Sequence, residues 1–216
     1  MKRAAALVLA SLLASPLASH PHIFVDTGLD LRFDADGRLA EVRVTWVYDE
    51  LYSLLITEDR GLDPDFDGVL TDAEIADLQG FDMNWSPGFN GDLVILQNGS
   101  ELSLSPPRAA TASFEGGRIT TTHVRSVATA QTPGQPIEVK PYDATYYTAY
   151  DITRGVRIEG AEACRSRIEM PDIDAALQEL QDVLASLDAD ASPEDEGLPD
   201  VGGMLASTVH VTCDMS

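Results

Sequence analysis

Twelve residues from Asp63 to Glu74 have the composition and spacing of a calcium-binding loop. They read Asp-Pro-Asp-Phe-Asp-Gly-Val-Leu-Thr-Asp-Ala-Glu. This order matches an EF-hand loop, in which alternate positions supply oxygen ligands, a glycine allows a sharp turn, and a final glutamate binds bidentately. The expected ligands are the side chains or carbonyls of Asp63, Asp65, Asp67, Val69, Thr71 and Glu74.

The chemistry of Ca²⁺ explains why these residue types are spaced in this way. The ion takes about six to eight hard oxygens, and clustered carboxylates repel one another without a cation. An acidic turn that contains a glycine by coincidence is the alternative interpretation. The sequence holds no second loop of this kind, which favours a structural or weak extracellular site with a dissociation constant on the order of 10⁻⁴–10⁻³ M.

The first nineteen residues are expected to be a secretory signal. Lys2 and Arg3 precede an apolar run, residues 4–13, that is too short to span a bilayer. Cleavage after Ser19 fits better than cleavage after Ala18, which would place Pro16 at the −3 position. We therefore expect a periplasmic protein with no membrane insertion after processing, in which residues 20–216 form a single domain.

Cleavage after Ser19 would leave His20 and His22 at the start of the mature chain. The ring and free amine of an N-terminal histidine can chelate one metal ion, and His22 adds a second imidazole. Imidazole suits Zn²⁺, Ni²⁺, Co²⁺ or Cu²⁺, whereas Ca²⁺ prefers oxygen. The sequence thus predicts a transition-metal site separate from the calcium loop. The alternative is a frayed terminus without a role.

The other histidines and the two cysteines are expected to be structural. His123 and His210 lie in strand-like segments, and the sequence leaves open whether either joins the N-terminal site. Cys164 and Cys213 are an even pair in an oxidising compartment, which predicts one disulfide. The sequence lacks a Cys-x-x-Cys motif and a nucleophile elbow, so we do not expect an enzyme.

The charge balance restricts the partners. The chain has a formal net charge of −22, and removal of Lys2 and Arg3 with the signal makes it −24. Few basic side chains remain to neutralise phosphates, so nucleic acid is excluded as a partner. The excess of carboxylates is compatible with cation binding and also promotes solubility.

The expected architecture is a mainly β, α+β domain resembling a β-sandwich. Alternating segments at Ile23–Phe33 and Leu39–Val47 predict a hairpin, and short strands are expected from Leu93 onward. An EF-hand helix–loop–helix should be inserted at about residues 49–85. An amphipathic helix at Asp172–Leu187 should pack on the sheet, and an acidic mobile loop should follow at about residues 189–203. A last strand is expected at Leu205–Cys213.

Several blocks resemble one bacterial family. These are His20-Pro21-His22-Ile23-Phe24-Val25-Asp26, Trp46-Val47-Tyr48-Asp49-Glu50-Leu51-Tyr52-Ser53, the acidic loop, and Tyr142-Asp143-Ala144-Thr145-Tyr146-Tyr147. They are similar to the family called domain of unknown function 1007, whose members are often described as the periplasmic component of an uncharacterised ABC-type transport system. The resemblance covers His20 to about Cys164 and implies a role beside nickel/cobalt or zinc permeases.

The aromatic and acidic residues within those blocks have a structural interpretation. Trp46, Tyr48, Tyr52, Tyr146 and Tyr147 are expected to pack in the core or across strands. We interpret the carboxylates between them as hydrogen-bond anchors rather than metal ligands; they are Asp49, Glu50 and Asp143.

The sequence is compatible with three functions. The first is a periplasmic metal-binding accessory protein of a transition-metal transport system, with an inner-membrane metal permease as its partner. The second is a secreted copper enzyme that uses an N-terminal histidine chelate, with His123 or His210 as the second ring. The third is a calcium-stabilised structural or adhesion protein. The sequence does not fix the oligomeric state.

Overall fold

The structure is a computed structural model that describes residues 21–128, 131–186 and 200–213. The predicted signal, His20 and most of the acidic segment lie outside these residues. The fold is mainly β, with 41% of residues in strands and 19% in helices. This agrees with the predicted class. No helix of the described part is long and apolar enough to cross a membrane.

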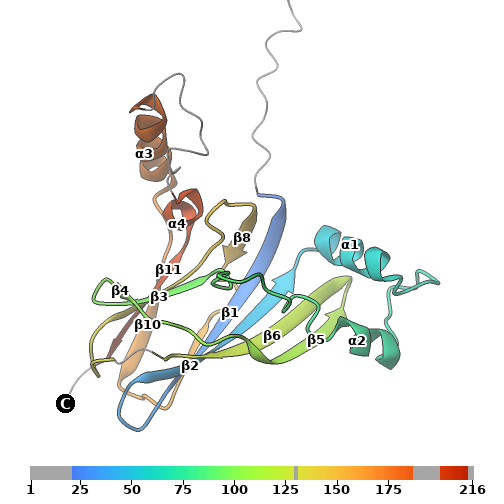
Figure 1. Ribbon diagram of the computed structural model, residues 1–216, viewed down its shortest axis with the longest axis horizontal. Coiled ribbons are helices and arrows are strands. Elements are labelled where there is room, and N and C mark those ends of the chain that lie inside the picture. Colours follow the sequence, from blue (N-terminus) through green and yellow to red (C-terminus); the bar gives the residue numbers. More distant parts are fainter. Residues whose placement is uncertain (1–20, 129–130, 187–199, 214–216) are drawn as a thin grey trace, which may run out of the picture.

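The strands form two sheets (Figure 1). The first has the order β5-β6-β2-β1-β8, with β9 also paired to β1. The second has the order β10-β11-β7-β3-β4. The strands of the first sheet are β1 (Ile23–Phe33), β2 (Leu39–Tyr48), β5 (Arg108–Glu115), β6 (Arg118–Ser126), β8 (Thr148–Asp151) and β9 (Val156–Glu159). Those of the second are β3 (Leu93–Gln97), β4 (Ser100–Glu101), β7 (Ile137–Pro141), β10 (Cys164–Glu169) and β11 (Thr208–Cys213).

The hairpin predicted near the N-terminus is confirmed. β1 pairs antiparallel with β2, from Val25 opposite Tyr48 to Phe33 opposite Leu39. On its other side β1 pairs in parallel with β8 and, further along, with β9. These parallel pairs join segments more than a hundred residues apart. Local alternation predicts that a segment is a strand, but not which strand it pairs with.

One apolar core receives side chains from both sheets. Leu29 and Val44 of the first sheet and Ile95 and Val139 of the second are buried and belong to the same cluster. Burial along β3 and β7 alternates strictly, as expected of strands with one face on a core. The two sheets therefore share one cluster of buried apolar side chains.

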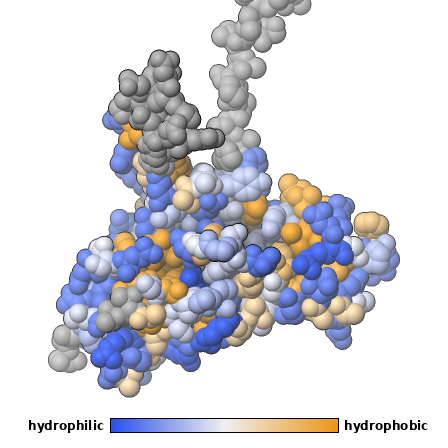
Figure 2. All heavy atoms as spheres, viewed as in Figure 1, coloured by the Kyte–Doolittle hydropathy of each residue, from blue (hydrophilic) through white to orange (hydrophobic). Residues whose placement is uncertain are grey.

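In the described part of the chain, two helices precede β3 and two lie near the C-terminus. They are α1 (Glu50–Arg60), α2 (Asp72–Leu78), α3 (Ile173–Ser186) and α4 (Val201–Leu205). Figure 1 shows α1 and α2 at the end of the first sheet, and α3 projecting from the body. Three leucines of α1 are exposed, namely Leu51, Leu54 and Leu55. Figure 2 shows apolar surface in the region of α1.

The C-terminal segment differs from the prediction in two ways. The apolar side of α3 is largely exposed rather than covered by the sheet: Ile173 and Leu177 are 45% and 44% exposed, and the helix contacts α4. Residues 201–203, placed in the acidic mobile loop, instead begin α4. Asp200 caps this helix by accepting from the Gly203 N–H at 2.8 Å. The Asp200 cap and the burial of Gly202 therefore favour a short helix over the loop that the composition predicted.

Candidate metal centre and its surroundings

The acidic loop is held between two capped helices. Asp49 caps the start of α1 by accepting a hydrogen bond from the Tyr52 N–H at 2.8 Å. Gly61 ends α1 in the left-handed conformation, which glycine adopts without strain. Arg60 near the end of α1 pairs with Asp77 of α2 at 3.0 Å. The two helices thus fix both ends of the intervening loop.

Hydrogen bonds from the loop backbone position the first carboxylate. The Asp67 and Gly68 N–H groups donate to the two carboxylate oxygens of Asp63, each at 3.0 Å. The Val69 N–H donates to Asp67 at 2.8 Å. Gly68 has a φ of 77°, as the sharp turn at this loop position requires. These contacts orient Asp63 and Asp67 within one tight turn.

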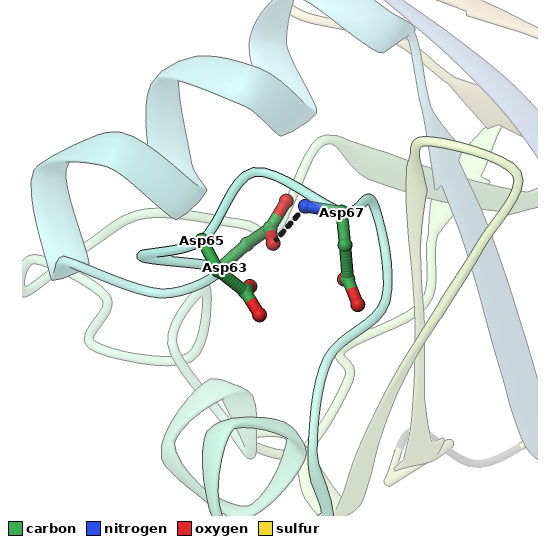
Figure 3. A group of neighbouring side chains, drawn as sticks. All are labelled: Asp63, Asp65 and Asp67. Atoms are coloured by element: carbon green, nitrogen blue, oxygen red, sulfur yellow. Dashed lines mark hydrogen bonds between the residues drawn. The ribbon is translucent and has the colours of Figure 1, made fainter.

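Three carboxylates of the loop lie together. Asp63, Asp65 and Asp67 each offer an oxygen within 4.8 Å of the others (Figure 3). Asp65 and Asp67 are exposed and Asp63 is partly buried. Among the described residues this is the one group of three or more histidine, cysteine or acidic side chains with such spacing. Three hard oxygen donors at this separation suit a divalent cation such as Ca²⁺.

Glu74 closes the loop from the first turn of α2. One carboxylate oxygen accepts from the Asp63 N–H at 3.0 Å, and the other accepts from the Thr71 N–H and hydroxyl at 2.7 Å. Hydrogen bonds from Thr71 lower the pKa of Glu74, with a further contribution from the Asp63 N–H. Glu74 is therefore ionised and bound to the backbone rather than grouped with the three aspartates.

The remaining predicted ligands, Val69 and Thr71, have different environments. Val69 is 67% exposed, so its side chain contributes nothing to a core. Thr71 caps α2 and forms a reciprocal capping box with Glu74. A residue predicted as a ligand is thus also a helix-capping residue, and the same hydrogen bonds shape the loop and start the helix.

The histidines in the described part lie at three different places in the fold. His22 is exposed just before β1, and its ring lies 4.8 Å from that of Tyr147. His123 on β6 is fully buried against Trp46 and Trp85. His210 on β11 lies between Glu138 and Glu169, at 3.8 and 3.5 Å. His20 lies outside the described residues.

Two anchor interpretations and the disulfide are confirmed. Asp49 also accepts from the Phe24 N–H at 2.8 Å, which ties α1 to β1. Asp143 accepts from the N–H groups of Thr145 and Thr148. Cys164 and Cys213 form a disulfide between β10 and β11.

The sequence did not indicate a role for Asp82. Its carboxylate is partly buried and accepts hydrogen bonds from the Tyr48 and Thr121 hydroxyls at 3.0 and 2.6 Å. The local sequence around it gives no signal.

These features define a class: a two-sheet, mainly β protein with one disulfide and an acidic helix–loop–helix between its strands. A family model described as "Protein of unknown function (DUF1007)" matches residues 5–213. The chain belongs to this family, as the sequence blocks predicted. A comparison with curated proteins finds no match.

Proposed function

We propose that this protein is a periplasmic metal-binding accessory protein of a transition-metal (nickel, cobalt or zinc) transport system, and that its acidic loop binds Ca²⁺. The observation that carries the metal-binding proposal is the grouping of the Asp63, Asp65 and Asp67 oxygens within 4.8 Å. Like charges at this distance repel one another, and a divalent cation among them would remove that repulsion.

The hydrogen bonds of the loop support Ca²⁺ in particular. The Asp63 carboxylate is already oriented by two backbone N–H groups. Glu74 is ionised and lies at the opposite end of the loop, where it can provide a fourth carboxylate. Because the oxygens are brought together by the fold, binding costs little ordering of the chain. We infer that the helix–loop–helix is of EF-hand type and that the two sheets are the layers of a sandwich.

The proposed transition-metal site is formed by His20 and His22. The His22 N–H donates to the Tyr147 carbonyl at 2.8 Å, which holds the chain beside β8 while the His22 side chain stays exposed. Signal cleavage after Ser19 would place a free amine and a second imidazole two residues from this fixed point. Zn²⁺, Ni²⁺, Co²⁺ or Cu²⁺ would suit these nitrogen donors. Transfer to or from an inner-membrane permease is the proposed use.

Calorimetry on the mature protein, stripped with chelator, tests the calcium site. Ca²⁺ should bind with a dissociation constant on the order of 10⁻⁴–10⁻³ M. Glu74→Gln should weaken binding strongly. Glu58→Gln removes an exposed carboxylate from α1 and serves as the matched control. Equal Ca²⁺ affinity of the two variants would refute the calcium proposal. So would the absence of any binding heat when Ca²⁺ is added to the wild-type protein.

Intact mass and metal analysis of the exported protein test the histidine site. The measured mass should correspond to a chain that begins at His20. One transition-metal ion should bind with a dissociation constant below about 10 µM, more tightly than Ca²⁺ binds to the acidic loop. A variant with one extra residue before His20 keeps both imidazoles but moves the free amine. This variant should lose most of the affinity. Unchanged affinity in the extended variant would exclude the amine as a ligand.

A further inference from the structure

A cavity of about 180 Å³ lies beside the first sheet, between β1, β2, β8, the start of α1 and the loop after α2. Six of the side chains that line it are aromatic: Trp46, Tyr48, Tyr52, Trp85, Phe89 and Tyr150. The chain has two tryptophans, and both are among them. Sequence reasoning assigned Trp46, Tyr48 and Tyr52 to packing alone, but the structure leaves a space between these rings.

One carboxylate lines the same cavity. Asp82 uses a single oxygen, Oδ2, to accept hydrogen bonds from the Tyr48 and Thr121 hydroxyls. Its other oxygen, Oδ1, is buried and has no hydrogen-bond partner among the described residues. Burial raises the pKa of this carboxyl, since a charged oxygen away from water lacks compensation. Asp82 therefore places a carboxylate in the lining of the cavity, and one of its oxygens is unpaired among the described residues.

A second residue that lines the cavity, Trp46, carries an unpaired hydrogen-bond donor. Trp46 is 4% exposed, and its Nε1–H has no hydrogen-bond partner among the described residues. Buried polar groups in proteins are nearly always paired, and here two residues that line one cavity each carry an unpaired buried atom. An acceptor such as a hydroxyl oxygen on a bound molecule would pair with Trp46, while an ammonium N–H would pair with Asp82.

The charges around the cavity favour a cation over an anion. The lining residues include Asp82 and no basic side chain. The Arg125 guanidinium lies 5.1 Å from the centre of the Trp85 ring, so one face of this ring is already covered by a cation. Trp46 and the tyrosines provide the remaining ring faces. Aromatic faces attract cations through their quadrupole, most strongly where water is excluded.

We propose that this cavity binds a small organic cation, a methylated amine that carries a hydroxyl group. The aromatic rings would surround the methyl groups, Asp82 would accept from the ammonium, and Trp46 would donate to the hydroxyl. The volume is below the range of about 300–1,000 Å³ that is usual for drug-sized ligands, so the ligand is small. This site is separate from the calcium loop and goes beyond the proposed metal-binding function.

Tryptophan fluorescence tests the proposal directly, because both tryptophans line the cavity. The probe is dimethylaminoethanol, which is protonated at neutral pH, added to full mature protein in chelator so that the metal sites have no influence. Its neutral isostere, isoamyl alcohol, has the same shape with carbon in place of nitrogen. The amine should change the emission with a dissociation constant below about 10 mM, and the isostere should bind at least about tenfold more weakly.

Two variants locate the binding. Asp82→Asn keeps the shape and the Tyr48 hydrogen bond but removes the charge, and it should weaken amine binding by about tenfold. Asp77→Asn makes the same change on the exposed surface of α2 and should bind like wild type. Equal affinity for the amine and its isostere would overturn the proposal. So would an unchanged emission with the amine, or a response to glucose in its place. Comparison of the amine with its neutral isostere in the wild-type protein tests cation binding even if Asp82→Asn does not fold.

Discussion

The side chain of Glu74 accepts a hydrogen bond from the backbone N–H of Asp63 at 3.0 Å, so the last residue of the acidic loop is tied to the first. This contact links the start of α2 to the end of α1 across the three grouped aspartates. Hydrogen bonds within the loop therefore hold its two ends together. An ion would add to a geometry that already exists.

Calcium should therefore stabilise the whole domain. If the dissociation constant is on the order of 10⁻⁴–10⁻³ M, about 10 mM Ca²⁺ should raise the free energy of unfolding by about 1.4–2.7 kcal/mol. Urea denaturation with Ca²⁺ and with chelator measures this change. Mg²⁺ at the same concentration is the control for ionic strength, and Asp65→Asn should reduce the effect. A calcium effect no larger than that of Mg²⁺ would contradict the prediction.

His123 should make the protein sensitive to acid. Burial lowers its pKa from 6.5 to about 4, with a further contribution from Arg125, so the ring is neutral in the folded state above this pH. The unfolded chain binds the proton at higher pH. Stability is therefore lost as the pH falls from about 6.5 towards 4, by up to about 3 kcal/mol.

The variant His123→Leu should lose this part of the acid sensitivity. It also removes two buried ring nitrogens that have no hydrogen-bond partner among the described residues. Urea midpoints at several pH values, compared as differences from wild type, isolate the effect of this one side chain. His210→Leu, which alters a partly exposed histidine, is the control. An acid dependence of His123→Leu as steep as that of wild type would disprove the assignment.

The disulfide should contribute strongly to stability. Cys164 and Cys213 are 49 residues apart, and closing a loop of this length removes unfolded-state entropy worth about 4 kcal/mol. The variant with both cysteines changed to serine should unfold at correspondingly lower urea concentration. Reductant should affect wild type in the same direction and leave the double variant unchanged. Equal urea midpoints for the two proteins would show that the cross-link is dispensable.

Gly202 should tolerate no side chain. A Cβ at this buried position would overlap the backbone carbonyl of Asp143, and the Gly202 N–H donates to the Ala144 carbonyl at 3.1 Å. Gly202→Ala should cost about 1–3 kcal/mol, because backbone must move to make room. In Gly203→Ala the new Cβ meets the end of the Asp200 side chain rather than backbone, so the loss should be smaller and limited to a weaker Asp200 cap. A similar fall in the thermal unfolding temperature of the two variants would argue against tight packing of α4.

The sequence by itself determined the features that depend on neighbouring residues. Alternation predicted β1 and most of β2, and the order of residue types between Asp63 and Glu74 predicted a tight acidic loop flanked by two helices. These signals are local, since hydrogen bonds within the loop span at most about a dozen residues and a strand shows its own period. The cysteine pairing followed because only two cysteines exist.

The tertiary structure alone decided which distant segments meet. The parallel pairing of β1 with β8, the projection of α3 from the body, and the burial of Asp82 beside Tyr48 depend on contacts between residues far apart in the chain. Trp46 and Trp85 are separated by 38 intervening residues, yet they line one cavity. Periodicity contains no information about such encounters, because they are set by how complete sheets pack and what space they leave.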